Sequence, residues 1–219
     1  MLKPYQENIH TIKNEIYEMG QEIIHANKVS LSALKENDMT MLKDVNLSIK
    51  KLSKRSNEID NLIVKTLALY SPEARDLREM VSYLKITNEL IRAGANAKEF
   101  IKTFKKYFSE DLDQAIILEY AIPLIKSSNK ALETTVALIK ESDDKIIEDG
   151  YKQVIVEESK TDDLYSMLEK NILKLVTKNL DLSKEYFDIL TSLRKLAKTS
   201  DRAVSIAHLV MYAELGGEL

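Results

Sequence analysis

Residues 71–108, SPEARDLREMVSYLKITNELIRAGANAKEFIKTFKKYF, contain the pattern that decides the fold. Apolar or small side chains recur here at alternating steps of three and four residues, which is the spacing of one face of a long α-helix. That face carries Met80, Tyr83, Thr87, Leu90, Gly94, Ala97, Ile101, Phe104 and Phe108. We interpret this stripe as a packing surface, in which Gly94 allows a close approach of another helix.

The same helical period runs through most of the chain, and the strict alternation typical of strands is hard to find. Polar breaks fall near residues 37–38, 71–72, 109–113, 142–144 and 179–183. They divide the chain into six segments, each long enough for a helix of roughly 45–55 Å. At the second break we predict that Ser71 is the N-cap of the following helix, with Pro72 at its first position.

The composition excludes several classes of protein. Among 219 residues there are only five Gly and three Pro, with no Trp and no Cys. A many-turned β-sandwich would lack its turn residues, and disulfides and thiolate metal sites are excluded. The net charge of −3 offers no basic field for nucleic acid, and no apolar run approaches the roughly 20 residues that cross a bilayer. We therefore expect a cytoplasmic protein with no nucleic-acid partner and no direct membrane insertion.

Long helices with short connections run back along one another, because each has an apolar stripe that only a neighbour of similar length can cover. The sequence therefore predicts an all-α, spectrin-repeat-like fold with six long antiparallel helices in two tandem three-helix bundles. We place the first bundle at residues 1–108 and the second at 109–219. We interpret the chain as a duplication with three helices per copy. Ser56 and Asp60 stand four residues apart, and Glu158 and Asp162 repeat that spacing 102 residues later.

Three stretches resemble the PhoU family of phosphate-signalling regulators, and together the resemblance covers roughly the whole chain. The most specific is LALYSPEARDLREMVSYLKITNELIRAGANAKEF at residues 67–100, with ARDLR at 74–78. EIYEMG at 15–20 is similar to the family's first helix, and TSDRAVSIA at 199–207 is similar to its second-copy signature.

The resemblance implies a non-enzymatic cytoplasmic regulator of phosphate uptake and phosphate-starvation signalling. PhoU proteins act as protein–protein adaptors between a phosphate ABC transporter, through its ATPase, and a membrane sensor histidine kinase. They usually self-associate, so a homodimer is expected. Two alternatives stay open: a metal-dependent sensor, and a helical accessory protein of another transporter.

Metal-binding members of the family typically place an acid, three residues and an Asp on the third and sixth helices. The corresponding third-helix residues here are Ile91 and Ala95, and the sixth-helix residues are Ala197 and Asp201. Three of four signature carboxylates are therefore absent. Hard cations need several oxygen ligands, so we predict that the first bundle has lost its site.

The resemblance leaves one residual metal site, in the second bundle. If the fifth and sixth helices align as in the family, Glu158, Asp162 and Asp201 gather three carboxylates that could hold a divalent or ferric ion weakly. The alternative is a solvated charged face, in which Asp201 pairs with Lys198 or Arg194 and the two fifth-helix acids lie in water. No other cofactor is predicted.

No local pattern indicates catalysis. The chain has no Gly-rich phosphate loop, and no two of its three histidines stand at ligand spacing. Candidate partner contacts lie instead on the third helix. Arg75 and Arg78 stand near a helix N-terminus that disfavours them, beside Asp76, so we expect either of them to pair across helices or with a partner; the alternative is ordinary ion pairing on the surface. Ile91 belongs either to the core or to a docking surface.

Overall fold

The computed structural model describes residues 3–43, 45 and 47–217, and within these residues it is helical with no strand. This confirms the predicted all-α fold. The described helices are α1 (Lys3–Glu36), α2 (Ile49–Tyr70), α3 (Ala74–Tyr107), α4 (Gln114–Leu138), α5 (Asp144–Lys178) and α6 (Ser183–Leu215), with two short 3-10 helices, η1 (Met39–Lys43) and η2 (Leu180–Leu182). None of the described helices combines the length and the apolar character that a membrane span requires.

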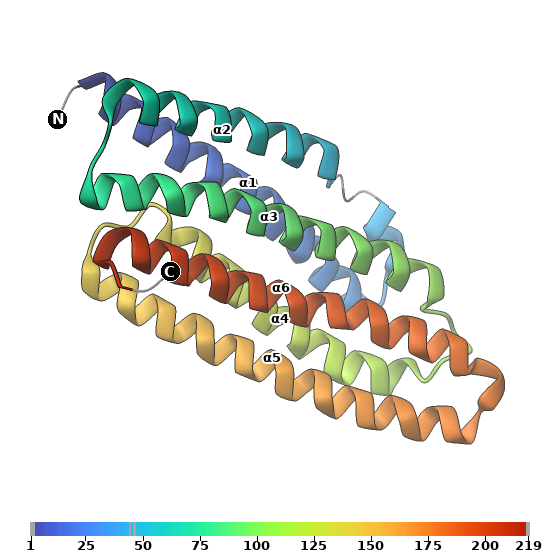
Figure 1. Cartoon of the computed structure of the whole chain (residues 1–219). Coiled ribbons are helices and arrows are strands. Elements are labelled where there is room, and N and C mark those ends of the chain that lie inside the picture. The colour runs from blue at the N-terminus through green and yellow to red at the C-terminus, as the bar shows by residue number, and fades with distance from the viewer. Residues whose placement is uncertain (1–2, 44, 46, 218–219) are drawn as a thin grey trace.

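The helices form two groups of three that lie side by side (Figure 1). Helices α1, α2 and α3 pack together, and so do α4, α5 and α6. The groups meet where α3 runs along α6 and where α1 packs on α4, while α2 and α5 lie on the outside. The α3–α6 junction therefore joins the two halves of the chain.

The apolar stripe of α3 faces the interior along its whole length. All nine of its members, from Met80 to Phe108, are buried, which confirms the packing interpretation. Phe100 and Phe104 are among the largest fully buried side chains, and their rings lie 5.2 Å apart between centroids. Full burial of such a side chain stabilises the fold by about 1.5–3 kcal/mol.

Gly94 and Gly20 mark two close helix approaches. A Cβ on Gly94 would lie 2.7 Å from Cδ1 of Leu52 on α2, which confirms the close approach predicted there. A Cβ on Gly20 of α1 would lie 2.5 Å from Cγ2 of Val136 on α4. The second contact holds α1 and α4 together across the two groups of helices.

The prediction that Ser71 caps the start of α3 is wrong. Ser71 ends α2 instead: its backbone N–H donates to the carbonyl of Leu67 at 3.0 Å, and its φ of 45° is left-handed. The first residue before α3 is Glu73, whose side chain makes no capping hydrogen bond. Because the last turn of α2 uses Ser71, Pro72 lies in the connection and not at the start of a helix.

Aspartate side chains cap the N-termini of α4 and α5. A carboxylate oxygen of Asp113 accepts a hydrogen bond from the Ile116 N–H at 3.1 Å, and Asp143 accepts from the Ile146 N–H at 3.0 Å. Both acids lie in predicted breaks. A carboxylate at this position satisfies a free N–H and interacts favourably with the helix dipole.

Candidate functional site: a carboxylate cluster on the second bundle

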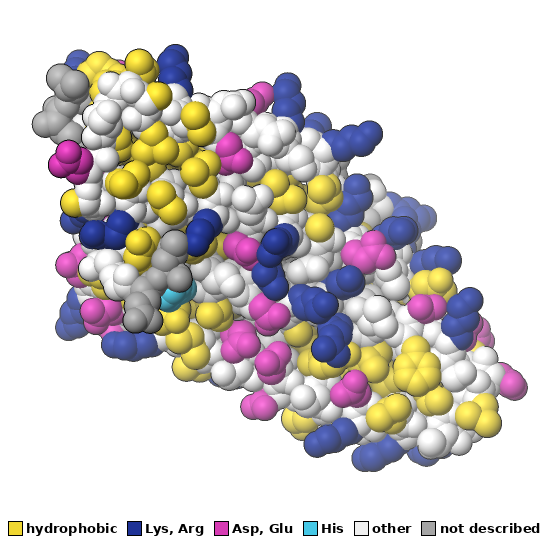
Figure 2. Space-filling view, in the orientation of Figure 1, with side chains coloured by type: hydrophobic (Ala, Val, Ile, Leu, Met, Phe, Trp, Pro, Cys, Tyr) yellow, Lys and Arg dark blue, Asp and Glu magenta, His cyan; other side chains and the backbone are white. Residues whose placement is uncertain are grey.

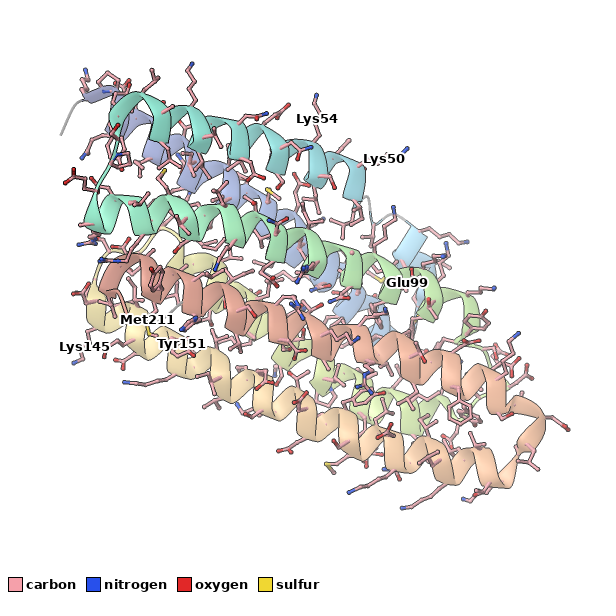
Figure 3. The ribbon with its side chains drawn as sticks, viewed as in Figure 1. Lys50, Lys54, Glu99, Lys145, Tyr151 and Met211 are labelled. Atoms are coloured by element: carbon pink, nitrogen blue, oxygen red, sulfur yellow. The ribbon has the colours of Figure 1, made fainter. Side chains whose placement is uncertain are left out.

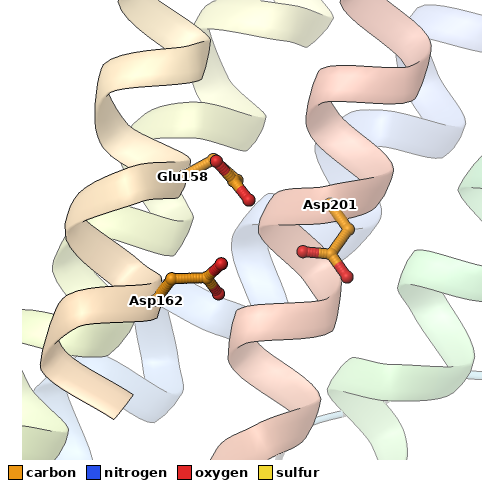
Figure 4. A group of neighbouring side chains, drawn as sticks. All are labelled: Glu158, Asp162 and Asp201. Atoms are coloured by element: carbon orange, nitrogen blue, oxygen red, sulfur yellow. The ribbon is translucent and has the colours of Figure 1, made fainter. Parts of the chain in front are cut away.

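Glu158, Asp162 and Asp201 form a cluster between α5 and α6 (Figure 4). Glu158 and Asp162 stand one turn apart on α5, and Asp201 faces them from α6. One carboxylate oxygen from each residue lies within 4.8 Å of the other two. Glu158 and Asp201 are half-buried and Asp162 is exposed, so the cluster opens to solvent on one side.

A buried pair of hydroxyls fixes the alignment of α5 and α6 beside the cluster. The Ser200 hydroxyl donates to Oγ1 of Thr161 at 3.1 Å, and both side chains are fully buried. Each residue directly precedes one of the clustered aspartates, so this bond places Asp162 and Asp201 on the same level. Sequence reasoning missed the pair. The only available signal was a hydroxyl residue before an aspartate on both helices.

The surroundings of the cluster disfavour the ionised carboxylates. Burial raises the pKa of Glu158, and the negative charges of Asp162 and Asp201 raise it further. Burial is also the largest cause of the raised pKa of Asp201, followed by the charge of Asp162. The positive charges of Arg202 and Lys198 act in the opposite direction on Asp201. Like charges that converge in this way are stabilised when a cation binds between them.

The neighbouring cations are engaged with other groups. The Arg194 guanidinium lies over the Tyr165 ring, 5.4 Å from its centroid, and Lys160 pairs with Glu157 at 2.9 Å. Among the described residues, neither Lys198 nor Arg194 forms an ion pair with Asp201. The alternative in which Asp201 is neutralised on its own helix therefore lacks the expected contacts.

Among its described residues, the first bundle has no matching cluster. Ala95 is exposed, Ile91 is half-buried against the apolar core, and Asp60 accepts a hydrogen bond from the Thr87 hydroxyl at 3.1 Å. Burial raises the pKa of Asp60, and the bond from Thr87 partly offsets that effect. Within the described residues, the only group of three or more carboxylate or histidine ligands at metal-binding distance is the one on the second bundle.

The internal register suggested by a spacing of 102 residues stays a prediction. Gly94, which precedes Ala95, lies against Leu52 of α2, and Ser200, which precedes Asp201, bonds to Thr161 of α5.

The donor chemistry of the cluster fits a hard cation. Three carboxylates supply oxygen ligands, and water can complete the coordination on the open side. The first bundle offers an exposed alanine and a half-buried isoleucine at the third-helix positions, which do not fit. The structure thus brings together the three predicted residues of the second bundle and no equivalent set among the described residues of the first.

The predicted partner-contact residues of α3 lie at different depths in the structure. Arg75 forms an ion pair with Glu214 of α6, so it links the two groups of helices. The Nε of Arg78 is buried without a hydrogen-bond partner, and Asp76 is half-buried in the first turn of α3. Ile91 lies at the edge of the core. A role for any of them in partner binding stays a prediction.

Comparison with known proteins identifies similar sequences. A family model described as the PhoU domain matches residues 16–103. A phosphate-specific transport system accessory protein PhoU homolog of Clostridium acetobutylicum is 21% identical, covering 99% of this chain and 97% of that protein. A protein of the same description from Borreliella burgdorferi is 22% identical, covering 96% and 94%.

Two crystal structures share the fold. PhoU from Pseudomonas aeruginosa superposes with a TM-score of 0.83 at 18% identity, covering 97% of this chain and 100% of that one. The phosphate transport system regulatory protein PhoU from Streptococcus pneumoniae has a TM-score of 0.78 at 19% identity, covering 98% and 99%. The similarity therefore extends over both groups of helices.

Proposed function

We propose that this chain, which belongs to the PhoU family, is a cytoplasmic regulatory accessory protein of a phosphate-specific transport system. It acts as an adaptor between the ATPase of a phosphate ABC transporter and a membrane sensor histidine kinase, and it has no catalytic activity of its own. The observation that carries the proposal is the similarity over nearly the full length to accessory proteins of phosphate transport.

The architecture supports an adaptor. We propose that residues 1–108 and 109–219 are two repeats of one three-helix unit, which present two long outer helices, α2 and α5, for contacts. Exposed apolar side chains, including Val64 and Val156 on these helices, are candidates for such contacts and for self-association as a homodimer.

The test is capture of partners by the tagged full-length chain from cells grown in high and in low phosphate. We expect the transporter ATPase and the histidine kinase to be enriched in at least one condition. Deletion of the gene should also derepress a phosphate-starvation reporter. Failure to capture either protein, together with an unchanged reporter, would contradict the proposal.

Arg75 and Arg78 are the residues to vary in the capture experiment. We expect the double variant Arg75→Gln, Arg78→Gln to lose partner capture while remaining folded. Lys54→Gln is a matched control because Lys54 is a highly exposed cation on the outer face of α2 (Figure 3). Equal capture by all three proteins would remove these arginines from the interface.

A metal-dependent sensor is the second candidate function, and the convergence of Glu158, Asp162 and Asp201 favours it. In this case a divalent or ferric ion would occupy the cluster and bias the packing of α5 against α6. Partner capture should then depend on the metal. Capture that is unchanged by a chelator and by Asp201→Asn would leave the adaptor role without a metal switch.

A further inference from the structure

A second polar site lies at the α3–α6 junction, apart from the carboxylate cluster. A pocket of about 560 Å³ opens there, with Lys85, Glu89 and Arg92 on the α3 side and Ser205 and His208 on the α6 side. Figure 2 shows Lys and Arg side chains gathered along this junction. The pocket thus takes its residues from both halves of the chain.

The pocket has an excess of positive charge. Glu89 is held between two guanidinium groups, with Arg92 at 3.2 Å and Arg202 at 2.9 Å, so its negative charge is offset within the protein. Lys85 forms no ion pair with any described residue. The lining thus carries the two positive charges of Lys85 and Arg92 against the one negative charge of Glu89, which Arg202 also offsets from outside the lining.

The nitrogen donors suit an oxyanion. Lys85 offers an ammonium and Arg92 a guanidinium from α3, and His208 offers an imidazole from α6. The His208 ring packs against the ring of Tyr151 on α5, with centroids 6.0 Å apart, which restrains its orientation. Tyr151 is labelled in Figure 3. The Ser205 hydroxyl already donates to the carbonyl of Asp201 at 3.0 Å, so its oxygen is left as an acceptor.

We propose that this pocket binds a small phosphate-type oxyanion, either inorganic phosphate or a phosphomonoester, between α3 and α6. Charge-assisted hydrogen bonds from an ammonium and a guanidinium are the strong contacts in phosphate sites, and a protonated phosphate oxygen can donate to Ser205. Because its ligands come from both halves of the chain, the bound anion would tie the first bundle to the second. This proposal rests on the pocket and not on the adaptor role.

Another pocket with several lysines is a weaker candidate and supplies a control. It lies between α1, α4 and α5, where Lys28 pairs with Glu133 at 2.8 Å and Lys160 pairs with Glu157 at 2.9 Å. Its remaining lysines are exposed and stand on α4 alone. Lys130 is one of them, and like Lys85 it is exposed and forms no ion pair with a described residue.

The test is calorimetric titration of the purified full-length chain with inorganic phosphate, in a chelating buffer whose ionic strength is held constant with chloride. We expect saturable binding at one site per chain. Lys85→Gln and Arg92→Gln should each weaken it roughly tenfold, the effect of losing one charged hydrogen bond. Lys130→Gln should bind as the wild type does. Glycerol phosphate in place of phosphate would identify phosphomonoesters as ligands.

A second readout locates the anion. The imidazole NMR signals of His208 should shift on addition of phosphate, while those of His10 and His25 on α1 should not. Arg92→Gln keeps Glu89 paired with Arg202, and Lys85 has no internal partner, so both variants should melt as the wild type does. Absence of saturable binding, an equal loss in Lys130→Gln, or binding that requires added metal and disappears in Asp201→Asn would each overturn the proposal.

Discussion

The face of the second bundle that carries Glu158, Asp162 and Asp201 differs sharply from the related face of the first. In the second bundle three carboxylates converge over a buried hydroxyl pair, and burial, followed by their mutual repulsion, raises the pKa of Glu158 and of Asp201. In the first bundle an exposed alanine and a half-buried isoleucine take the related places, and Leu52 fills the space beside Gly94.

The difference shows two ways to join an outer helix to its neighbour. The first bundle uses close apolar contact, which needs no ligand to be stable. The second keeps charges whose mutual repulsion opposes the contact until a cation or protons offset it. A cation can therefore act on the second bundle and leave the first unaffected.

Metal binding should show the largest difference between the two faces. We expect the purified protein to carry well under one equivalent of iron, zinc or manganese, because only three carboxylates are available. Titration with Mn²⁺ should nevertheless reveal one weak site per chain. Asp201→Asn should lower the affinity for Mn²⁺ by about tenfold to a hundredfold, since it removes a direct ligand.

Asp60→Asn is the matched control in the first bundle. Its amide oxygen can still accept the hydrogen bond from Thr87, so the fold should be retained. Mn²⁺ affinity should be unchanged in this variant. Stoichiometric tightly bound metal in the purified protein, or an equal loss of affinity in Asp60→Asn, would contradict the assignment of the site to the second bundle.

Within the first bundle, an aspartate should lower the free energy of unfolding more at Ile91 than at Ala95. Ile91→Asp should lower the free energy of unfolding by about 2 kcal/mol, because apolar contact with the core is lost and a charge is brought near it. Ala95→Asp changes an exposed position and should shift that free energy by less than about 0.5 kcal/mol. Urea unfolding measures both. Equal values would show that Ile91 contributes nothing to the core.

Much of the fold could be predicted because periodicity reports burial directly. All nine stripe positions of α3 are buried, and every break between helices falls where polar residues cluster. Ser71 was misassigned because a serine before Pro-Glu is compatible with the end of one helix or the start of the next. Which of these occurs depends on where α2 stops, and that follows from packing.

The candidate site could be predicted only in part. Helical spacing places Glu158 and Asp162 on one face of α5, but only the resemblance to the family placed Asp201 of α6 opposite them, where the structure has it. The alignment of α5 against α6 could not be obtained from spacing, since a shift of one heptad keeps the same face inward. The buried hydrogen bond between Ser200 and Thr161 fixes that alignment.

Substitutions at helix ends should change the free energy of unfolding by a smaller amount, with opposite signs in the two halves of the chain. Ser71 ends α2 with a left-handed backbone, which costs about 1 kcal/mol for any residue other than glycine. Ser71→Gly should therefore raise the free energy of unfolding by about 1 kcal/mol. In the second half, Asp143→Ala should lower it by about 1 kcal/mol through loss of the cap on α5.

The free energies of unfolding of Ser71→Gly and Asp143→Ala, measured by heat or urea, test whether Ser71 ends α2. If that residue were the N-cap of α3, glycine would instead cost a few tenths of a kcal/mol. The sign of the change in Ser71→Gly therefore distinguishes the two positions, and a loss of stability would contradict the assignment to the end of α2.

The pH dependence of stability should show the smallest difference. The pKa values of Glu158 and Asp201 are raised in the folded protein, so the folded state binds more protons than the unfolded state. Their contribution to the free energy of unfolding is therefore most favourable below the unfolded pKa values of about 4, and it falls as pH rises through the raised values. In a chelating buffer, Asp201→Asn should gain stability relative to the wild type as pH increases across this window.

The comparison of wild type and variant at each pH is essential, because other carboxylates titrate over the same range. Asp163→Asn is the control: Asp163 is exposed on α5 and lies outside the cluster, so its difference from the wild type should not change with pH in this way. Saturating Mn²⁺ should abolish the advantage of Asp201→Asn near neutral pH, because the bound cation stabilises the ionised carboxylates. A difference between Asp201→Asn and the wild type that stays constant with pH would contradict a raised pKa of Asp201 in the folded protein.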